Sequence, residues 1–571
     1  MMKHLAFSLL SVVLLLAAPS AYAKEAAAPL VAQSAVGNSY AVATVQPIAT
    51  DAAMAVLADG GNAIDAAVCA MLTLSVVDNH NSGIGGGCLC MVRTADGRLL
   101  AIDGRETAPA LAHRDMYVVA GKPDSSLSQT GPLAVGTPGA LAAYQRLLDE
   151  AGTMPLARLL EPGRDAARDG FPIDSNYARR LKSVAKKLAR FEGSRGLLRE
   201  DLTPYEEGQI LVQPDLAATY DALIQHGADW FYRGGFAERV DAWMQLHGGV
   251  LRAGDFAAYE AKQRTPVEST YRGRRIVGFP PPSSGGVHVA QVLNILESFD
   301  LADLFASDEV AALHVVAEAM KLAFADRAYW LGDADFARVP RGLMSKPYAA
   351  ELAERIDADR AKRVPTHGEP PEWRQDVFGR HTTHVSTADA AGNWVAITAT
   401  VNTGFGSKVI VPGTGVVLNN EMDDFSIQPG TPNAFGLVGA ENNAVEPGKR
   451  PLSSMSPTVV LDEAGEPLMT VGAAGGPKII TQVILTLINT IDRGMPLADA
   501  VAAPRLHHQW RPDRLSVERR FDPGLAFGLA KRGHLLHVLS SAGVTQAISV
   551  GPDGVITAVS DPRVPGKSAA K

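Results

Sequence analysis

One stretch, residues 381–402 (HTTHVSTADAAGNWVAITATVN), constrains the fold most because it has the pattern of a single β-hairpin. Its second half alternates strictly between two faces, which is typical of a β-strand. The two faces consist of Val395, Ile397, Ala399 and Val401, and of Trp394, Ala396, Thr398, Thr400 and Asn402. Residues 382–388 are rich in β-branched side chains and predict the first strand. Between the strands we expect a three-residue loop in which Gly392 takes the left-handed conformation.

The register of this hairpin decides which polar side chains meet. We expect Asp389 to pair with Asn393 across the turn. This register places Thr382 directly opposite Thr400. A threonine can be a nucleophile if a base lies beside it, and a free α-amine, with a pKa of about 7.7–8.0, is close to what a general base needs. Because Thr382 is inside the chain, its amine exists only if the preceding peptide bond is cut.

The same stretch resembles the start of the small subunit in γ-glutamyltransferases, which are N-terminal-nucleophile hydrolases. The resemblance is carried by TTH-x-S, by the turn ending in Gly-Asn, and by T-x-N-T-x-FG. It extends over nearly the whole mature chain, from residues 49–77 to residues 561–563. It implies an α/β fold of the four-layer αββα type, in which two stacked sheets lie between layers of helices.

Members of the family cleave themselves just before this threonine. The resemblance therefore implies cleavage between His381 and Thr382. The products would be a large subunit of residues 24–381 and a small catalytic subunit of residues 382–571, which stay interlocked in one fold. The residue before the nucleophile differs among members, so the presence of His381 leaves the cleavage rate open. Residues 360–381 are polar and contain proline, which favours a flexible segment ahead of the cut.

The resemblance also assigns substrate-binding roles to residues that lie far apart in the sequence. A lone arginine is usually a solvated surface residue. The R-E-x-A-P setting of Arg105, however, resembles that of the family arginine that binds the α-carboxylate of the substrate. Ser453 and Ser454 lie between two prolines and can point hydroxyls at the same carboxylate. The expected acceptors for the α-ammonium group are Asn402, Glu421 and Asp424.

Two glycine-containing loops complete the expected site. In the segment GAAGGP, Gly475 and Gly476 allow a close approach of the backbone and can aim N–H groups at a developing oxyanion. Residues 429–436 resemble the lid over the pocket in many members, with the aromatic Phe435 in the lid.

The resemblance implies a γ-glutamyltransferase with glutathione hydrolase activity. Thr382 would attack the γ-glutamyl carbonyl of glutathione or a related amide, and Thr400 would orient the attacking hydroxyl. The resulting γ-glutamyl-threonine ester would pass its acyl group to water, an amino acid or a peptide.

Two other functions remain as alternatives. A sibling activity on the same scaffold is an acylase that cleaves glutaryl side chains from cephalosporins. A function of another class is that of an inactive exported binding protein, which keeps the pocket but never cuts itself. The intact Thr382, Thr400 and glycine pair favour an enzyme over a binding protein.

The sequence gives no indication of a cofactor or a metal. The glycine loop at residues 79–87 departs from G-x-G-x-x-G and precedes a strand, so tight backbone packing is expected there. The acidic cluster at residues 421–424 does not match a calcium loop. His507 and His508 lack the spacing of metal ligands and are interpreted as structural. The chain also has no G-x-S-x-G elbow of a serine hydrolase.

Charge and the N-terminus bear on partners and location. The formal net charge is −8 and no basic tract occurs, so nucleic acid is not an expected partner. Residues 1–23 have the pattern of a signal peptide with cleavage after Ala23, rather than of a membrane anchor. We therefore expect export to the periplasm or the medium. The three cysteines, Cys69, Cys88 and Cys90, are expected to be buried, inert thiols.

Three apolar segments have patterns that indicate helices or strands. Residues 49–77 predict two helices broken at two glycines, and residues 314–330 predict an amphipathic helix. The run at residues 479–491 is a core helix or strand, because it contains Thr, Gln and Asn within an apolar pattern.

Overall fold

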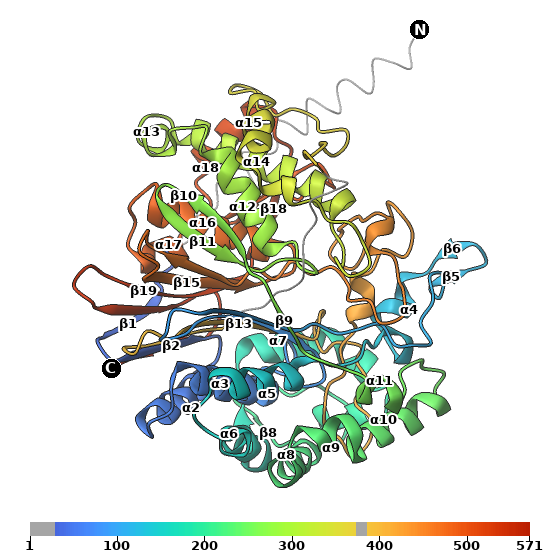
Figure 1. Cartoon of the computed structure of the whole chain (residues 1–571). Helices are drawn as coiled ribbons and strands as arrows, with labels where there is room; N and C mark the ends of the chain where they lie inside the picture. The colour runs from blue at the N-terminus through green and yellow to red at the C-terminus, as the bar shows by residue number, and fades with distance from the viewer. Residues whose placement is uncertain (1–28, 373–384) are drawn as a thin grey trace.

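A computed structural model describes residues 29–372 and 385–571 of the chain. Two seven-stranded antiparallel sheets face each other, and helices cover the outer face of each (Figure 1). The first sheet has the order β1 (Gln33–Gly37), β20 (Ile556–Ser560), β19 (Val544–Val550), β15 (Pro467–Ala474), β14 (Thr458–Leu461), β11 (Arg274–Gly278) and β10 (Val267–Tyr271). The second has the order β21 (Lys567–Ala570), β2 (Tyr40–Thr44), β12 (Ser386–Asp389), β13 (Trp394–Thr400), β3 (Gly87–Arg93), β4 (Leu99–Gly104) and β9 (Lys262–Arg264).

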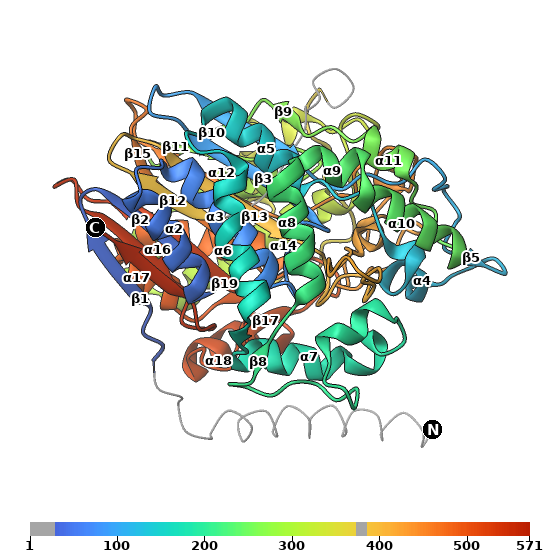
Figure 2. The ribbon, with the colours of Figure 1, turned by 90° about the horizontal axis from the view of Figure 1, so that it is seen from below.

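The helices form two outer layers. One layer covers the second sheet and is seen face-on in Figure 2; it includes α2 (Pro47–Ala58), α3 (Ala63–Val77), α5 (Ala140–Ala151), α6 (Leu156–Asp169) and α8 (Pro214–His226). The other covers the first sheet and includes α12 (Gly285–Leu296), α14 (Glu309–Trp330) and α16 (Lys478–Ile491). The arrangement is the four-layer αββα fold that the family resemblance implies.

The alternation of β13 explains how a strand can serve two cores at once. Val395 and Ile397 point to the helix side, where they join the cluster built around α3. Ala396 and Trp394 point the other way and pack between the two sheets. Burial of both faces in this way is why the strand carries no charged side chain.

The break between the first two helices follows from local capping. The side chain of Asn62 accepts hydrogen bonds from the N–H groups of Ile64 and Asp65, and Asp65 accepts one from the Asn62 N–H at 2.9 Å. This is a capping box, which satisfies the N–H groups that a helix start leaves unpaired. The two predicted helices and their break are confirmed.

Three further expectations are settled by the structure. The segment 479–491 lies within the helix α16, which decides between the helix and strand interpretations. The helix expected at residues 314–330 is confirmed as part of α14, although it is buried on nearly all sides rather than on one face. The three cysteines are free and buried. None of the described helices is both long and apolar enough to cross a membrane.

The parts of the chain before and after residues 373–384 are interleaved in both sheets. In the second sheet, β12 and β13 lie between β2 and β3. In the first sheet, β11 and β10 continue the sheet beyond β14. Neither part contains either of the two seven-stranded sheets in full, so the two must fold together.

Candidate active site

A cleft of about 970 Å³ contains the predicted site. It reaches the end of β13 on one sheet and the end of β15 on the other. Each sequence-predicted site residue that lies in the described part of the chain lines it: Arg105, Thr400, Asn402, Glu421, Asp424, Phe435, Ser453, Ser454, Gly475 and Gly476. The expected nucleophile Thr382 and its neighbour His381 lie outside the described residues.

The hairpin has the predicted register wherever both strands are described. Ser386 pairs with Ala396, and the Asp389 N–H donates to the Asn393 carbonyl at 3.1 Å. Gly392 has a φ of 95°, the left-handed conformation expected for the loop. The pairing of Thr382 with Thr400 continues this register but stays a prediction, because Thr382 is not described.

Thr400 ends β13 at the wall of the cleft and is half-buried. Its Oγ1 accepts a hydrogen bond of 2.7 Å from the N–H of Asn402. Asn402 has a φ of 76°, and its side chain donates to the Asn420 carbonyl at 2.9 Å. An asparagine tolerates this backbone conformation better than most residues do. The two contacts fix the end of the strand where the cleft begins.

Arg105 follows β4 and is fully buried in the wall of the cleft. Its guanidinium lies 2.8 Å from Glu421 and 2.7 Å from Asp424, and its Nε donates to the Pro451 carbonyl at 3.1 Å. Burial lowers the pKa of Arg105, but the surrounding carboxyl groups outweigh burial and hold that pKa above its ordinary value. The arginine therefore stays charged.

Two of the carboxyl groups around Arg105, those of Glu421 and Glu106, are costly to ionise. Burial raises the pKa of Glu421 well above its ordinary value, and it raises the pKa of Glu106 to about 8; in both cases the charge of Arg105 offsets only part of the effect. Glu421 and Asp424, two of the expected acceptors for the α-ammonium group, thus lie in direct contact with the expected carboxylate-binding arginine. One cluster contains charges of both signs.

Ser453 and Ser454 also line the cleft, and a buried arginine outside the predicted set holds the side chain of Ser454. Arg327, on α14, donates to Ser454 Oγ and to Ser284 Oγ, each at 2.9 Å. Because Oγ of Ser454 accepts from Arg327, its own proton is free to be donated to a ligand. Arg327 is buried, which lowers its pKa to about 10.

Arg327 lies in the stretch that predicts an amphipathic helix, and nothing in that stretch indicates a site residue. Its neighbour Asp326 has structural partners, because its carboxylate accepts hydrogen bonds from Gln291 and Tyr348. The pattern of α14 contains no signal that distinguishes the site-facing Arg327 from its neighbours, since the helix is buried nearly all round.

The glycine loop between β15 and α16 has the strained backbone that its sequence suggests. Gly475 has a φ of 142° and Gly476 a φ of 63°. A Cβ on Gly476 would lie 2.7 Å from the ring of Phe435, and one on Gly475 would lie 3.1 Å from Gly543. Glycine is required here for both conformation and space. Neither N–H group forms a backbone hydrogen bond to another described residue.

Residues 429–436, the predicted lid, contact this loop through Phe435. Asn433 donates to Asp424 at 3.2 Å, and the Phe435 carbonyl accepts from Gln509 at 3.3 Å. Gln509 in turn contacts His507 at 2.9 Å, and His507 contacts Thr481 at 3.0 Å. His507 is thus a structural histidine, as expected, but it also connects the lid to the first turn of α16.

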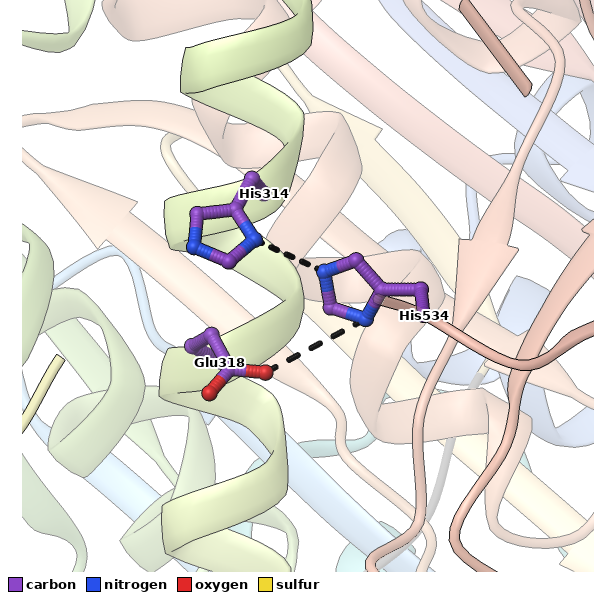
Figure 3. Close-up of side chains that lie close together, drawn as sticks. All are labelled: His314, Glu318 and His534. Atoms are coloured by element: carbon purple, nitrogen blue, oxygen red, sulfur yellow. Dashed lines mark hydrogen bonds and ion pairs between the residues drawn. The ribbon is translucent and has the colours of Figure 1, made fainter. Parts of the chain in front are cut away.

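One group of side chains among the described residues has the composition of a metal site: His314, Glu318 and His534 (Figure 3). His314 contacts His534 at 2.8 Å and the Asp357 carbonyl at 2.7 Å. The ammonium of Lys321 lies 2.6 Å from Glu318. The carboxylate thus already has a cation beside it, and both nitrogens of His314 have protein partners. We assign no metal to this cluster.

Two antiparallel sheets stacked between helix layers, with a polar cleft at the strand ends, define the fold of the N-terminal-nucleophile hydrolases. A family profile described as Gamma-glutamyltranspeptidase matches residues 49–571. The glutathione hydrolase proenzyme of Escherichia coli (strain K12) is 43% identical over 525 residues, which cover 91% of this chain and 90% of that protein. The acylase ACY 1 proenzyme of Pseudomonas sp. (strain SE83) is 36% identical over 548 residues, which cover 94% of each.

A solved structure agrees with these sequence matches. The crystal structure of cephalosporin acylase from Bacillus halodurans superposes with a TM-score of 0.85 at 28% sequence identity, covering 96% of this chain and 98% of that one. The chain therefore belongs to the gamma-glutamyltranspeptidase family.

Proposed function

We propose that this protein is a self-processed γ-glutamyltransferase that also hydrolyses glutathione. The observation that carries the proposal is the cluster of Arg105, Glu421 and Asp424 in the wall of the cleft. A γ-glutamyl donor carries an α-carboxylate and an α-ammonium on one carbon. A site with a guanidinium next to two carboxyl groups offers a partner to each.

The residues around the cluster fit the same substrate. The Ser454 hydroxyl, with its oxygen held by Arg327, has a proton to donate to the α-carboxylate. Ser453 lies beside it on the cleft wall. Asn402 adds an amide at the end of β13. With the amino-acid end of the donor held here, its γ-carbonyl reaches toward Thr400 and the glycine loop.

In the proposed reaction the hydroxyl of Thr382 attacks the γ-carbonyl carbon. The α-amine of Thr382 takes the hydroxyl proton, and the N–H groups of Gly475 and Gly476 bind the oxyanion, worth about 3–4 kcal/mol for one such donor. The bond to the leaving nitrogen breaks as that nitrogen receives the proton. Water or the amine of an amino acid or peptide then attacks the ester and regenerates Thr382.

The α-amine of Thr382 requires the proposed cut after His381. The large subunit would consist of residues 24–381 and the small subunit of residues 382–571. The interleaved strands support this proposal, because β12 and β13 remain hydrogen-bonded between β2 and β3 after the chain is cut. Residues 1–23 would direct export to the periplasm or the medium before the precursor matures.

A glutaryl acylase is the second candidate, since an acylase proenzyme is 36% identical to this chain. A glutaryl group has no α-ammonium, so the carboxyl groups of Glu421 and Asp424 would lack a partner on the substrate. The test is to incubate purified protein with glutathione and with a glutaryl anilide. Rapid release of glutamate from glutathione, by protein that migrates as two fragments, supports the proposal. Faster turnover of the glutaryl compound would favour the acylase.

A further inference from the structure

The cleft continues beyond the glycine loop, away from the Arg105 cluster. Asp424 contacts Asn433 of the lid, and the lid residue Phe435 covers Gly476. Gly475 is the other glycine of this loop, and a Cβ built on it would lie 3.8 Å from the Cβ of Lys478. The order along this wall is therefore the charged cluster, the lid, the two glycines and then Lys478.

Lys478 has no ion-pair partner among the described residues. It is the first residue of α16, is only partly exposed, and lines the cleft. Burial lowers its pKa, and the charge of Arg180 lowers it further. No carboxylate among the described residues lies within ion-pair distance of its ammonium group, so its desolvation is not offset by a partner.

Arg180 brings a second positive charge to the same region. It lies on α7 (Ser175–Leu188), also lines the cleft, and is exposed. Outside the Arg105 cluster, the described acidic side chains that line the cleft are Asp78, Asp174 and Glu518. Asp78 accepts a hydrogen bond from Asn81 at 3.0 Å, and burial raises its pKa to about 8 although the charge of Arg180 lowers it. Asp174 caps α7 by accepting from the N–H of Tyr177 at 2.8 Å, and Glu518 is paired with Arg563 at 2.6 Å. This end of the cleft is therefore positive.

We infer that Lys478 and Arg180 form a subsite for the terminal carboxylate of a peptide bound on the leaving-group side of the reaction centre. This inference rests on the proposed γ-glutamyl transfer. The leaving group of glutathione is a dipeptide whose carboxylate lies on the far side of the scissile amide from the α-amino acid group. With the γ-glutamyl end at Arg105 and the carbonyl at the glycine loop, that carboxylate extends toward Lys478. Peptide acceptors occupy the same side when they attack the ester.

The experiment compares glutathione with its C-terminal amide, which differs only in the loss of this carboxylate. For the unaltered protein we expect kcat/KM for glutathione to exceed that for the amide by about tenfold, the value of one charge-assisted hydrogen bond. In Lys478→Met the ratio should fall toward one, mainly through a higher KM for glutathione. Arg180→Met should lower this ratio of kcat/KM values by a smaller amount. Lys182 is an exposed residue of α7, the helix of Arg180, and does not line the cleft, so Lys182→Met should keep the original ratio.

The outcomes separate this inference from the proposed function. Equal kcat/KM for glutathione and its amide in the unaltered protein, together with good turnover of a γ-glutamyl anilide, would overturn the subsite and leave the proposed function intact. A ratio in Lys478→Met and Arg180→Met that equals the ratio in Lys182→Met would overturn it as well. Failure to turn over any γ-glutamyl compound would instead refute the proposed function on which the subsite depends. The ratio is measured within each variant, so a change in the amount of folded enzyme does not affect it.

Discussion

The guanidinium of Arg105 and the carboxylate of Asp424 lie 2.7 Å apart in the wall of the cleft, although 318 residues separate them in the chain. Glu421 lies almost as close to the same guanidinium, at 2.8 Å. The site thus holds its opposite charges against each other. When a zwitterionic α-amino acid group binds, its carboxylate can pair with Arg105 and its ammonium with Asp424, so that two ion pairs replace one. A ligand that carries only a carboxylate would instead compete with the carboxyl groups for Arg105.

Arg105→Ala should raise the KM for γ-glutamyl donors about a hundredfold, because two charge-assisted contacts to the α-carboxylate are lost. Stability should also fall, by about 3–5 kcal/mol, since the buried carboxyl groups lose their cation. Initial rates and chemical unfolding measure the two effects. Arg98→Ala, which removes an exposed arginine paired with Asp96, serves as the matched control and should change neither.

Thr382→Ala should give an uncut chain without activity, because the hydroxyl that attacks the preceding peptide bond is missing. In the unaltered protein, Thr382 should be the first residue of a fragment that ends at Lys571. Gel electrophoresis and end-sequencing test both statements. Thr383→Ala, the neighbouring threonine, is the control and should still be cut. Activity in uncut Thr382→Ala protein would refute the assignment of the nucleophile.

Thr400→Ala should slow self-cleavage markedly while the protein stays folded. The predicted register places Thr400 opposite the nucleophile, and the net value of one such hydrogen bond is only about 1 kcal/mol of stability. Thr400→Ser keeps the hydroxyl and should restore cleavage. The measurement is the rate at which the two fragments appear, together with the melting temperature of each variant. Cleavage at the normal rate in the alanine variant would show that the register or the contact is wrong.

The hairpin could be predicted from sequence because its information is local. Alternation fixes which side chains share a face, and Gly392 fixes the turn, so the pairing of Ser386 with Ala396 follows. The direct contact of Arg105 with Asp424 could not be read in this way, because no local pattern relates residues so far apart. Arg327 was missed for a different reason: α14 is buried nearly all round, so periodicity does not tell which side chain meets the site.

The family resemblance supplied most of the site residues, and the cleft brings together all those that are described. The resemblance did not supply the contacts that support these residues, such as the hydrogen bond from Arg327 to Ser454 or the one from Gln509 to the Phe435 carbonyl. The segment 479–491 shows the limit of composition alone. Its polar residues are compatible with either a strand or a helix, and only packing against the neighbouring sheet and helices selects the helix α16.

Gln509→Leu should loosen the lid. Gln509 donates to the Phe435 carbonyl at 3.3 Å and contacts His507 at 2.9 Å, so leucine removes the hydrogen bonds that connect the lid to α16. We expect KM for γ-glutamyl donors to rise about fivefold, in line with about 1 kcal/mol for one hydrogen bond. The value of kcat should change less. Steady-state kinetics check the split between the two constants. Gln245→Leu, on the surface of α10 (Gly235–Leu246), is the control and should behave as the unaltered protein.

The last prediction separates the γ-glutamyl enzyme from the glutaryl acylase. In the γ-glutamyl donor, an ammonium group meets the carboxyl groups of Glu421 and Asp424; in the glutaryl donor, a methylene would face them. A polar site that is left without its partner can reject an analogue by about 10⁴-fold. We therefore expect kcat/KM for a γ-glutamyl anilide to exceed that for the matching glutaryl anilide by about this factor.

The variant Asp424→Asn tests whether the carboxylate causes this discrimination. It keeps the shape of the side chain but removes the negative charge that attracts the α-ammonium. Its kcat/KM for the γ-glutamyl anilide should fall about a hundredfold, since a charged contact is lost, while the glutaryl value should fall little. The ratio of kcat/KM values between the two substrates should narrow accordingly.

The control for this variant is Asp462→Asn, because Asp462 does not line the cleft and accepts from the N–H of Glu466. Asp423→Asn is a poor control, because Asp423 accepts hydrogen bonds from Ser128 and from Ala434 of the lid. Comparable kcat/KM for both anilides in the unaltered protein would overturn the γ-glutamyl assignment in favour of the acylase.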